Sequence, residues 1–572
     1  MIRQNKIWIF LLACSLLFSS ITSAQNNSKF EKLSTDILES LQSFYPVNST
    51  QMGIHHYDHR FTDYSSSSVK KMISSLTNFE KSLYKYKDAN LTKDEQLNYK
   101  LLKSNVDIAL LDLKQIAWYK KNPQLYVDEA VNGLYSLILS NHAPLNEKIV
   151  PIISRIEAVP QLFQTAQKNI QKPPKIYIEA AVETLESAID FYKEVSAELM
   201  NKFPERADRI LKSTNQARDA MSEFITFLSE ITPGDEKSFA IGTKQLDYML
   251  EHQYFLDYNS DSLLKIGEAL FEEADQAYKE YQEIIEADHQ NGYDSVFVPS
   301  VFTKQDVLDY YNWETEQIKI FLETQNIVTV PEDIAPVTVV ETPPFLRSMI
   351  AGIAYQPAGP FDTNQHGYFY VRPIPDDLSR KMLESKYRYV QRRGFKGSAV
   401  HEAYPGHHLQ MQIAGMQTDP VRKWQMNLML IEGWALYCEQ MMYEQGLFGD
   451  ENPTQWLGIL GGIRFRAARI IADMKLHTGQ FTFQECVDWM TEALDGTSES
   501  DKAYIRNQVR KYTMSPTMPM CYLTGKTEIL NLLDSYQQKM GESFSLQEFH
   551  DELLSYGSIP PTLLWELMDL KK

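Results

Sequence analysis

Three of the twelve histidines lie within one eight-residue segment, His401-Glu402-Ala-Tyr-Pro-Gly-His407-His408. Imidazole and carboxylate side chains are common protein ligands of zinc. A His-Glu pair on a helix is also typical of zinc peptidases, in which the next histidine follows four residues later and the glutamate acts on a water held by the metal. The segment therefore predicts a zinc-dependent hydrolase.

The spacing of these histidines departs from that pattern and requires an interrupted helix. On a regular helix, positions 401 and 407 would be about 240° apart, and positions 401 and 408 would be about 10.5 Å apart along the axis. Pro405 has no N–H to donate to the carbonyl of His401, and Gly406 tolerates whatever turn follows. A bulge at residues 404–406 could return either histidine to the metal. His407 needs the smaller distortion, and His408 is the alternative.

A third protein ligand is expected downstream, because catalytic zinc usually keeps three protein ligands and one open position. The segment Met426–Met442 is apolar on nearly every face, which predicts a buried helix. A carboxylate inside such a helix is costly unless it is paired or bound to a metal, so Glu432 is the candidate ligand. Glu439, two turns further on, could orient a ligand histidine. The expected ligands of one Zn²⁺ per chain are His401, His407 or His408, and Glu432.

Glu402 is the expected general base, which would take a proton from the attacking water and return it to the leaving group. A developing oxyanion needs a hydrogen-bond donor besides the metal, and Tyr522 or Tyr512 could supply it. Arg466 and Arg469 could hold a substrate carboxylate, although arginines at helical spacing from an aspartate are more typical of structural ion pairs.

Helical periodicity covers most of the chain and predicts a mostly α fold. Apolar residues recur at three- and four-residue spacing from about residue 30 to about residue 230 and again from about residue 379 onward. Between these regions, Val337–Val340 and Gly367–Arg372 are rich in β-forming residues and predict a small sheet near the active-site helix. An extended peptide could pair with Gly367–Arg372 if that strand lies at the sheet edge. His55, His56 and His59 are expected to be surface or packing residues.

The segment Thr232-Pro-Gly-Asp235 is the strongest helix breaker in the first half of the chain. It predicts a boundary between an N-terminal helical region, residues 25–235, and a catalytic region with the zinc site, residues 236–572. The two regions could instead form one continuous helical unit around a channel.

Residues 1–24 have the features of a signal peptide. Arg3 and Lys6 precede the apolar stretch Ile7–Phe18, and Ala24 ends a small-residue cleavage site. We therefore expect an exported protein, either periplasmic or secreted. Lipid attachment at Cys14 is the less favoured alternative, because it would leave a very short apolar stretch before the cysteine.

Composition excludes several classes of protein. The net charge of −19 over 572 residues argues against nucleic acid as a partner, which would require a basic patch. No segment after the signal peptide approaches the roughly 20 apolar residues that span a bilayer. The remaining cysteines, Cys438, Cys486 and Cys521, show no zinc-knuckle spacing and are expected to be buried free thiols.

The chain resembles a bacterial family known as domain of unknown function 885, whose members are described as zinc metallopeptidases. The matching stretches are His401–Gln410 and Glu432–Glu439, with further likeness at Gly53–Asp58 and from Arg466 to Asp473. The likeness extends over nearly the whole mature chain. The family is in turn distantly similar to the helical, neurolysin-type metallopeptidases (gluzincins), which hold zinc in a deep channel between helical halves.

This resemblance implies a large helical metallopeptidase-like fold. It also implies His401, His407 and Glu432 as zinc ligands and Glu402 as the general base. One segment departs from the family, whose members tend to have a Pro-Gly-Gln-Ala-like run before a tyrosine. Here that run is Pro516-Thr-Met-Pro-Met-Cys-Tyr522, so residues 517–519 differ while Tyr522 is kept.

The expected function is hydrolysis of peptide bonds at a zinc site. One alternative is a zinc hydrolase that acts on a non-peptide amide or ester. Another is an exported binding protein without catalytic activity, which the intact Glu402 argues against, because an idle site has no need of its base.

Overall fold

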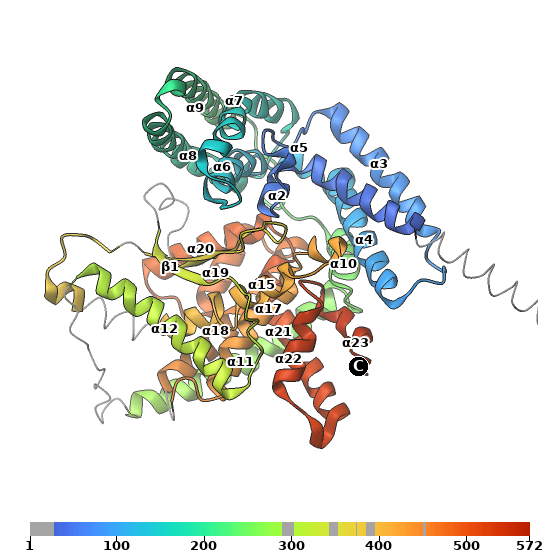
Figure 1. Cartoon of the computed structure of the whole chain (residues 1–572), viewed down its shortest axis with the longest axis vertical. Helices are drawn as coiled ribbons and strands as arrows, with labels where there is room; N and C mark the ends of the chain where they lie inside the picture. Colours follow the sequence, from blue (N-terminus) through green and yellow to red (C-terminus); the bar gives the residue numbers. More distant parts are fainter. Residues whose placement is uncertain (1–27, 289–302, 343–352, 373, 385–394, 450–452) are drawn as a thin grey trace, which may run out of the picture.

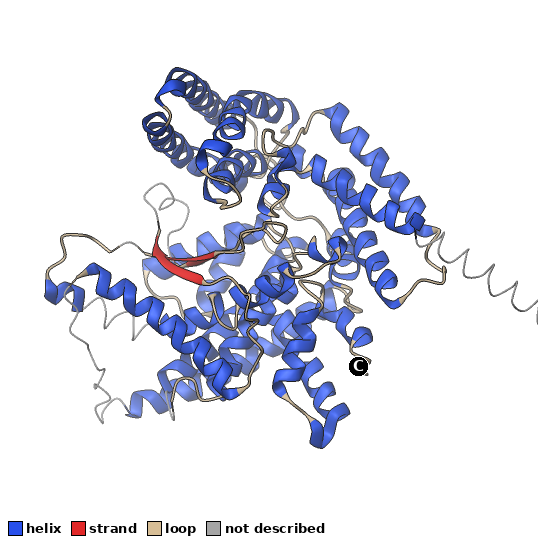
Figure 2. Cartoon of the chain, viewed as in Figure 1, coloured by secondary structure: helices blue, strands red, loops and turns tan. Residues whose placement is uncertain are grey.

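The computed structural model describes residues 28–288, 303–342, 353–372, 374–384, 395–449 and 453–572. The predicted signal peptide, including Cys14, lies outside the described residues. The structure is 73% helical with one small three-stranded sheet, so the predicted mostly α fold is confirmed (Figure 2).

The first half of the chain consists of helices that pack as neighbours, with α7 and α8 both against α9 (Figure 1). In α9 the buried residues include Ile210, Ala217, Phe224 and Leu228, which lie on one face because they recur at helical spacing. After the helical residues 28–44, the helices are α2 Pro46–Gln51, α3 Ser66–Tyr84, α4 Lys93–Leu110, α5 Trp118–Lys121, α6 Gln124–Leu139, α7 Leu145–Asn169, α8 Lys175–Lys202 and α9 Ala207–Glu230.

The second half of the chain carries the candidate site, and in it α17 packs along α21 and α11 along α18. These helices are α10 Thr243–Tyr254, α11 Ser260–Asp288, α12 Lys304–Gln325, α14 Phe395–Glu402, α15 His407–Gly415, α16 Pro420–Lys423, α17 Leu428–Glu444, α18 Pro453–His477, α19 Phe483–Ala493, α20 Glu499–Met514, α21 Met518–Met540, α22 Leu546–Ser555 and α23 Leu564–Leu567.

The sheet contains β1 (Val337–Glu341), β2 (Ala354–Gln356) and β3 (Gly367–Val371) in the order β1-β3-β2. Strand β3 pairs in parallel with β1 and antiparallel with β2. Both predicted strands are therefore present, but the expectation that Gly367–Arg372 could be an edge is wrong, because β3 is paired on both sides. Within the described ranges the outer strands are β1 and β2. The backbone of Val339 in β1 bonds to the side chain of Asn312 in α12. The sequence patterns did not predict β2.

The main hydrophobic core is shared by the two predicted regions. One cluster of buried residues extends from Phe30 and Leu38 in the first helices to Leu564 and Met568 near the C-terminus. The boundary at residue 235 stays a prediction. Cys438, Cys486 and Cys521 are buried free thiols, as expected. None of the helices in the described ranges is long and apolar enough to cross a membrane.

Candidate metal centre

The helix that begins the motif is interrupted at the predicted place. Helix α14 ends at Glu402 and α15 begins at His407, with the Tyr404–Pro405 peptide bond in the cis form between them. The bulge packs so closely that a Cβ on residue 406 would lie 1.9 Å from the carbonyl oxygen of His401. Only glycine fits there. The indole of Trp434 on α17 donates from Nε1 to the carbonyl of Pro405 at 2.8 Å and fixes the other side of the bulge.

The interruption brings His401, His407 and Glu432 together. One donor atom from each lies within 4.8 Å of the other two. The Oε2 atom of Glu432 is 3.5 Å from Nε2 of His407 and 3.8 Å from Nε2 of His401. The two imidazole rings are nearly perpendicular, at 84°, with centroids 4.8 Å apart. Thus α14, α15 and α17 each contribute one candidate ligand.

These three side chains fit a zinc ion. Ligands about 2.0 to 2.1 Å from a tetrahedral zinc lie about 3.4 Å from one another, close to the observed separations. The Oε2 atom of Glu432 is buried and has no hydrogen-bond partner among the described residues. Burial alone would raise the pKa of Glu432, but His407, His401 and Tyr522 lower that pKa to about 2. Glu432 is therefore a carboxylate with a free oxygen directed at two imidazoles.

Glu439 positions His401 from the other side of its ring. Its Oε1 lies 2.8 Å from Nδ1 of His401, so Nε2 remains available toward Glu432. Glu439 is buried, which would raise its pKa, but the hydrogen bond with His401 and the nearby charge of Arg466 lower it. Arg466 lies 3.8 Å from the same carboxylate oxygen. The arrangement has the His-carboxylate pairing that commonly orients metal ligands.

His408 lies outside the group. Its Nδ1 is 2.8 Å from the hydroxyl of Tyr355, and its Nε2 is 2.9 Å from the carbonyl oxygen of Ala335. Both ring nitrogens therefore face partners on the sheet side of α15. Of the two histidines that the spacing left open, the structure brings only His407 to Glu432.

Glu402 lies beside β2, an outer strand of the sheet in the described residues. The backbone N–H of Tyr355 in β2 donates to Oε2 of Glu402 at 3.1 Å. Because Glu402 directly follows the candidate ligand His401, this contact places the edge strand next to the candidate metal centre. The geometry links the predicted base to a backbone donor that sequence patterns did not indicate.

Tyr522 reaches the centre because α17 and α21 approach each other closely. Gly433 and Gly525 face each other across this contact, and a Cβ on residue 525 would lie 1.8 Å from the carbonyl oxygen of Met429. Tyr522 lies close enough to Glu432 to help lower the pKa of that carboxyl. Thr517, one of the three positions before Tyr522 that differ from the family pattern, has a φ of 68°. This value lies in the left-handed region that favours glycine.

Arg469 lies over the rings of both candidate tyrosines. Its guanidinium carbon is 4.0 Å from the ring centroid of Tyr522 and 5.3 Å from that of Tyr512. The hydroxyl of Tyr512 is buried without a hydrogen-bond partner among the described residues. In the described part of the chain, neither Arg466 nor Arg469 forms an ion pair with Asp473. Asp473 instead accepts a hydrogen bond from the backbone N–H of Thr517. The expected structural ion pair with this aspartate is absent there.

Comparison with known proteins gives a family and a fold. The family model described as "Bacterial protein of unknown function (DUF885)" matches residues 46–568. No curated protein sequence matches the chain.

Solved structures with the same fold include two bacterial proteins. One, of unknown function and described as a lipoprotein, is from Shewanella oneidensis; it is 23% identical, with a TM-score of 0.73 over 94% of this chain and 99% of its own. Another, from Colwellia psychrerythraea and also described as a lipoprotein, is 17% identical, with a TM-score of 0.71 over 95% and 98%. Metallocarboxypeptidase 1 of Trypanosoma cruzi matches at 10% identity over 95% and 92%, with a TM-score of 0.42 that is too low to establish a common fold.

Proposed function

This chain belongs to the bacterial DUF885 family, and on that premise we propose that it is a zinc-dependent hydrolase that cleaves peptide bonds. The observation that carries the proposal is the buried Oε2 of Glu432, which lacks a hydrogen-bond partner among the described residues and faces Nε2 of both His401 and His407. A carboxylate is costly to bury in this way unless a cation completes its surroundings. Two imidazoles and one carboxylate form a typical ligand set of catalytic zinc.

Zinc held by these three residues would act as a Lewis acid toward water and toward the carbonyl of the substrate. Glu402 is the proposed general base. Its carboxylate would accept a proton from the attacking water and deliver that proton to the nitrogen of the leaving amine. Tyr522 would donate its hydroxyl hydrogen to the oxyanion that develops on the carbonyl. Burial raises the pKa of Tyr522 well above its usual range, so the hydroxyl keeps the proton that this role requires.

The position of β2 supports a peptide as the substrate. Among the described residues β2 is an outer strand of the sheet, and its Tyr355 N–H bonds to Glu402, which would release this donor to a peptide strand aligned beside β2. Extended peptides commonly bind by adding a strand to such an edge, because their backbone groups complete the hydrogen bonds of the sheet. We propose that β2 holds the substrate backbone while Glu402 acts on the water.

We also propose that the protein is exported. The basic and apolar residues of positions 3–18 support a signal peptide. Two proteins of similar fold are described as lipoproteins, which supports export and keeps lipid attachment at Cys14 as the alternative.

Metal content and hydrolysis, measured together, test the proposed activity. The purified protein would be compared with the His401→Ala and Glu402→Gln variants on a mixed peptide library, with Glu444→Gln as a control on an exposed position of α17. His401→Ala is expected to lose both zinc and hydrolysis. Glu402→Gln should keep zinc and lose hydrolysis by about 10²- to 10⁴-fold, the usual contribution of general acid–base catalysis.

Three other outcomes would overturn the proposal. Full hydrolysis by the Glu402→Gln variant would exclude Glu402 as the base. Zinc binding with activity only on ester or non-peptide amide substrates would identify a different hydrolase. Absence of both metal and hydrolysis in the wild-type protein would indicate an exported binding protein.

A further inference from the structure

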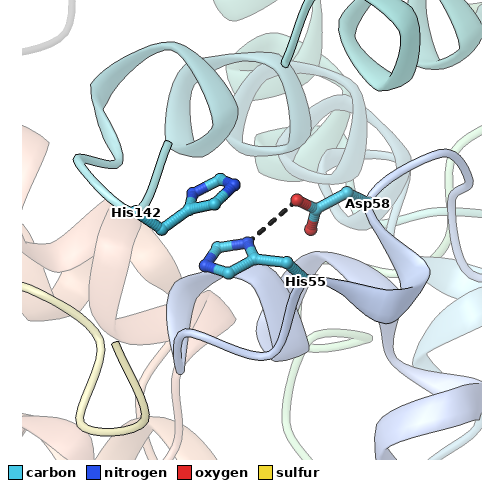
Figure 3. Close-up of side chains that lie close together, drawn as sticks. All are labelled: His55, Asp58 and His142. Carbon is cyan, nitrogen blue, oxygen red and sulfur yellow. Dashed lines mark hydrogen bonds and ion pairs between the residues drawn. The ribbon is translucent and has the colours of Figure 1, made fainter. Parts of the chain in front are cut away.

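A second group of histidine and aspartate side chains lies in the N-terminal region. His55 lies in the short helix η1 (His55–Tyr57), Asp58 follows it, and His142 lies in the segment between α6 and α7. One donor atom from each lies within 4.8 Å of the other two. In Figure 3 the two imidazole rings lie one above the other, and a ring nitrogen of each points toward the carboxylate of Asp58. His56 and His59 are exposed as expected, but His55 is not a surface residue of that kind.

Each of the three side chains also forms a hydrogen bond on its outer side, which is the side that faces away from the other two. Nε2 of His55 lies 2.8 Å from Oδ1 of Asp362, and Oδ1 of Asp58 accepts from the hydroxyl of Thr50 at 2.6 Å. Nδ1 of His142 lies 3.0 Å from the hydroxyl oxygen of Ser140. On the inner side, Nδ1 of His55 and Oδ2 of Asp58 form a hydrogen-bonded pair at 2.9 Å, and Nε2 of His142 is the remaining ring nitrogen.

The bond with Ser140 uses Nδ1 of His142 and leaves Nε2. The hydroxyl of Ser140 lies 3.0 Å from Nδ1 of His142 and 3.2 Å from the carbonyl oxygen of Leu137. In the tautomer in which Nδ1 donates to this hydroxyl, the lone pair of the ring is on Nε2. Nε2 has no hydrogen bond to any of the residues that the structure describes. This nitrogen is a free donor for a cation beside a buried carboxylate.

The segment that carries Asp362 is fixed against η1 by backbone packing. A Cβ on Gly53, whose φ is 84°, would lie 2.4 Å from the backbone nitrogen of Asp362, and the N–H of Phe361 donates to the carbonyl of Met52 at 2.9 Å. Asp362 therefore remains beside His55 irrespective of a metal. Its bond to Nε2 of His55 repeats the bond between Glu439 and His401 at the candidate catalytic centre.

We propose that His55, His142 and Asp58 form a second binding site for a divalent transition-metal ion, separate from the candidate catalytic centre. Two imidazoles and one carboxylate suit zinc and its neighbours in the first transition series rather than calcium or magnesium. Nδ1 of His55 and Oδ2 of Asp58 are 2.9 Å apart and share a hydrogen bond, which a bound ion would replace once Nδ1 loses its hydrogen. Asp362 orients His55 from the outer side.

The place of the site in the fold indicates a structural role. Thr50, Ser140 and Asp362, which hydrogen-bond to the three side chains, also line a cavity of about 330 Å³. Asp362 lies in the connection between β2 and β3, and the Tyr355 N–H in β2 contacts Glu402. An ion bound to His55, His142 and Asp58 would tie η1 to the connection between α6 and α7, and would act on the segment of Asp362 only through His55.

Metal stoichiometry of matched variants tests this site independently of catalysis. The protein would be stripped with a chelator, reloaded with Zn²⁺ or Co²⁺, and analysed by elemental mass spectrometry. We expect two ions per chain for the wild type and one each for His142→Ala and His401→Ala. The double variant should bind none, and His56→Ala, which replaces an exposed neighbour, should keep both. The Co²⁺ absorption spectrum of His401→Ala would report the second site alone, and added Zn²⁺ should raise the melting temperature of His401→Ala but not of the double variant.

The two metal proposals fail in different ways. If the wild type binds one ion that only His401→Ala removes, the second site is wrong and the catalytic centre stands. His55 would then act as a protonated bridge between Asp58 and Asp362. If His142→Ala removes the only ion, the catalytic centre is wrong and the second site stands. Circular dichroism of the metal-free variants separates loss of metal from loss of folding, and His142→Gln, which keeps a polar side chain, provides a milder substitution for the same measurement.

Discussion

Nδ1 of His401 lies 2.8 Å from Oε1 of Glu439, seven residues along α17 from the candidate ligand Glu432. Residues seven apart lie on the same face of a helix, two turns from each other. One helix therefore supplies both a metal ligand and the carboxylate that orients another ligand. The His401–Glu439 hydrogen bond places the Nδ1 hydrogen on the outer side of the ring and the Nε2 lone pair toward Glu432.

Replacement of Glu439 by glutamine should weaken zinc binding without removing a ligand. The amide can still accept a hydrogen bond from His401, but it lacks the negative charge that makes the imidazole a stronger donor to the metal. We expect zinc affinity to fall by about 10- to 100-fold. Titration of the metal-free protein with zinc in the presence of a competing chelator would measure this change.

Glu444→Gln is the control for this substitution, because Glu444 is exposed at the end of the same helix. It should bind zinc as the wild type does, and excess zinc should restore hydrolysis to Glu439→Gln. An unchanged zinc affinity in Glu439→Gln would remove the positioning role assigned to Glu439.

Tyr522 and Tyr512 form a matched pair for the oxyanion role, because Arg469 covers both rings but only Tyr522 reaches Glu432. Tyr522→Phe should lower kcat by about 10²- to 10³-fold, the usual loss when one oxyanion donor is removed, with little change in KM. Zinc content should stay the same. Steady-state kinetics on one peptide substrate would give both constants.

Tyr512→Phe should leave kcat within about threefold of the wild type, since the hydroxyl that it removes has no partner among the described residues. A large fall in kcat for Tyr512→Phe with none for Tyr522→Phe would reverse the assignment. Loss of zinc from Tyr522→Phe would instead mean that this hydroxyl supports Glu432 as a ligand.

The sequence was sufficient to predict the candidate ligands but not to choose between His407 and His408. Their positions depend on the path of the bulge, which is fixed by the contact of Trp434 with Pro405 and by the close approach at Gly406. Neither contact follows from spacing along the chain. The proximity of Tyr522 to the centre likewise depends on glycines in two helices that are distant in sequence.

The fold class followed from periodicity, because long amphipathic helices carry a repeated signal. The sheet order did not, since Ala354–Gln356 is only three residues long and has no alternation that distinguishes a strand from a loop. The contact between His55 and His142 was also not predictable from the sequence. Those residues are 87 positions apart, and His142 stands in a connection without a recognisable motif.

Gly406→Ala should destabilise the bulge and the metal centre together. The added methyl group would lie 1.9 Å from a backbone oxygen, which cannot move as a side chain can. We expect a loss of more than about 3 kcal/mol in the free energy of unfolding, the upper end of ordinary overpacking, and loss of zinc. Thermal unfolding and metal analysis of the purified variant would measure both effects.

Gly458→Ala is the matched control, and it should change the free energy of unfolding in the opposite direction. Gly458 lies exposed in α18 with nothing within 4 Å of the added Cβ. Alanine favours the helix there, so the variant should gain about 0.5 to 1 kcal/mol. Equal stability of the two alanine variants would contradict the close approach at Gly406.

Buried neutral histidines should make the protein less stable in acid, and His550, whose ring packs against Trp434, offers a test. Its Nδ1 donates to the carbonyl of Ile327 at 2.7 Å, and its Nε2 accepts from the hydroxyl of Tyr437 at 2.8 Å. Burial lowers its pKa to about 4, although the bond to Ile327 opposes this shift. In the unfolded chain the pKa of histidine is about 6.5. Between about pH 6.5 and pH 4 the unfolded chain therefore binds a proton that the folded protein does not, and stability falls as the pH falls.

In the His550→Asn variant, the unfolded chain no longer takes up a proton at residue 550, because asparagine does not titrate. Asparagine can still donate a hydrogen bond to the carbonyl of Ile327. The slope of the free energy of unfolding against pH should decrease by up to about 1.4 kcal/mol per pH unit in that range. Urea unfolding at about pH 7, 6 and 5 would measure it, with metal-free protein so that zinc release in acid does not contribute. His56→Asn, at an exposed position, should keep the wild-type slope. If both variants kept that slope, His550 would not be the group that remains neutral. The dependence on acid would then have to come from other buried histidines. His477 is one of them, and burial lowers its pKa to about 4 as well.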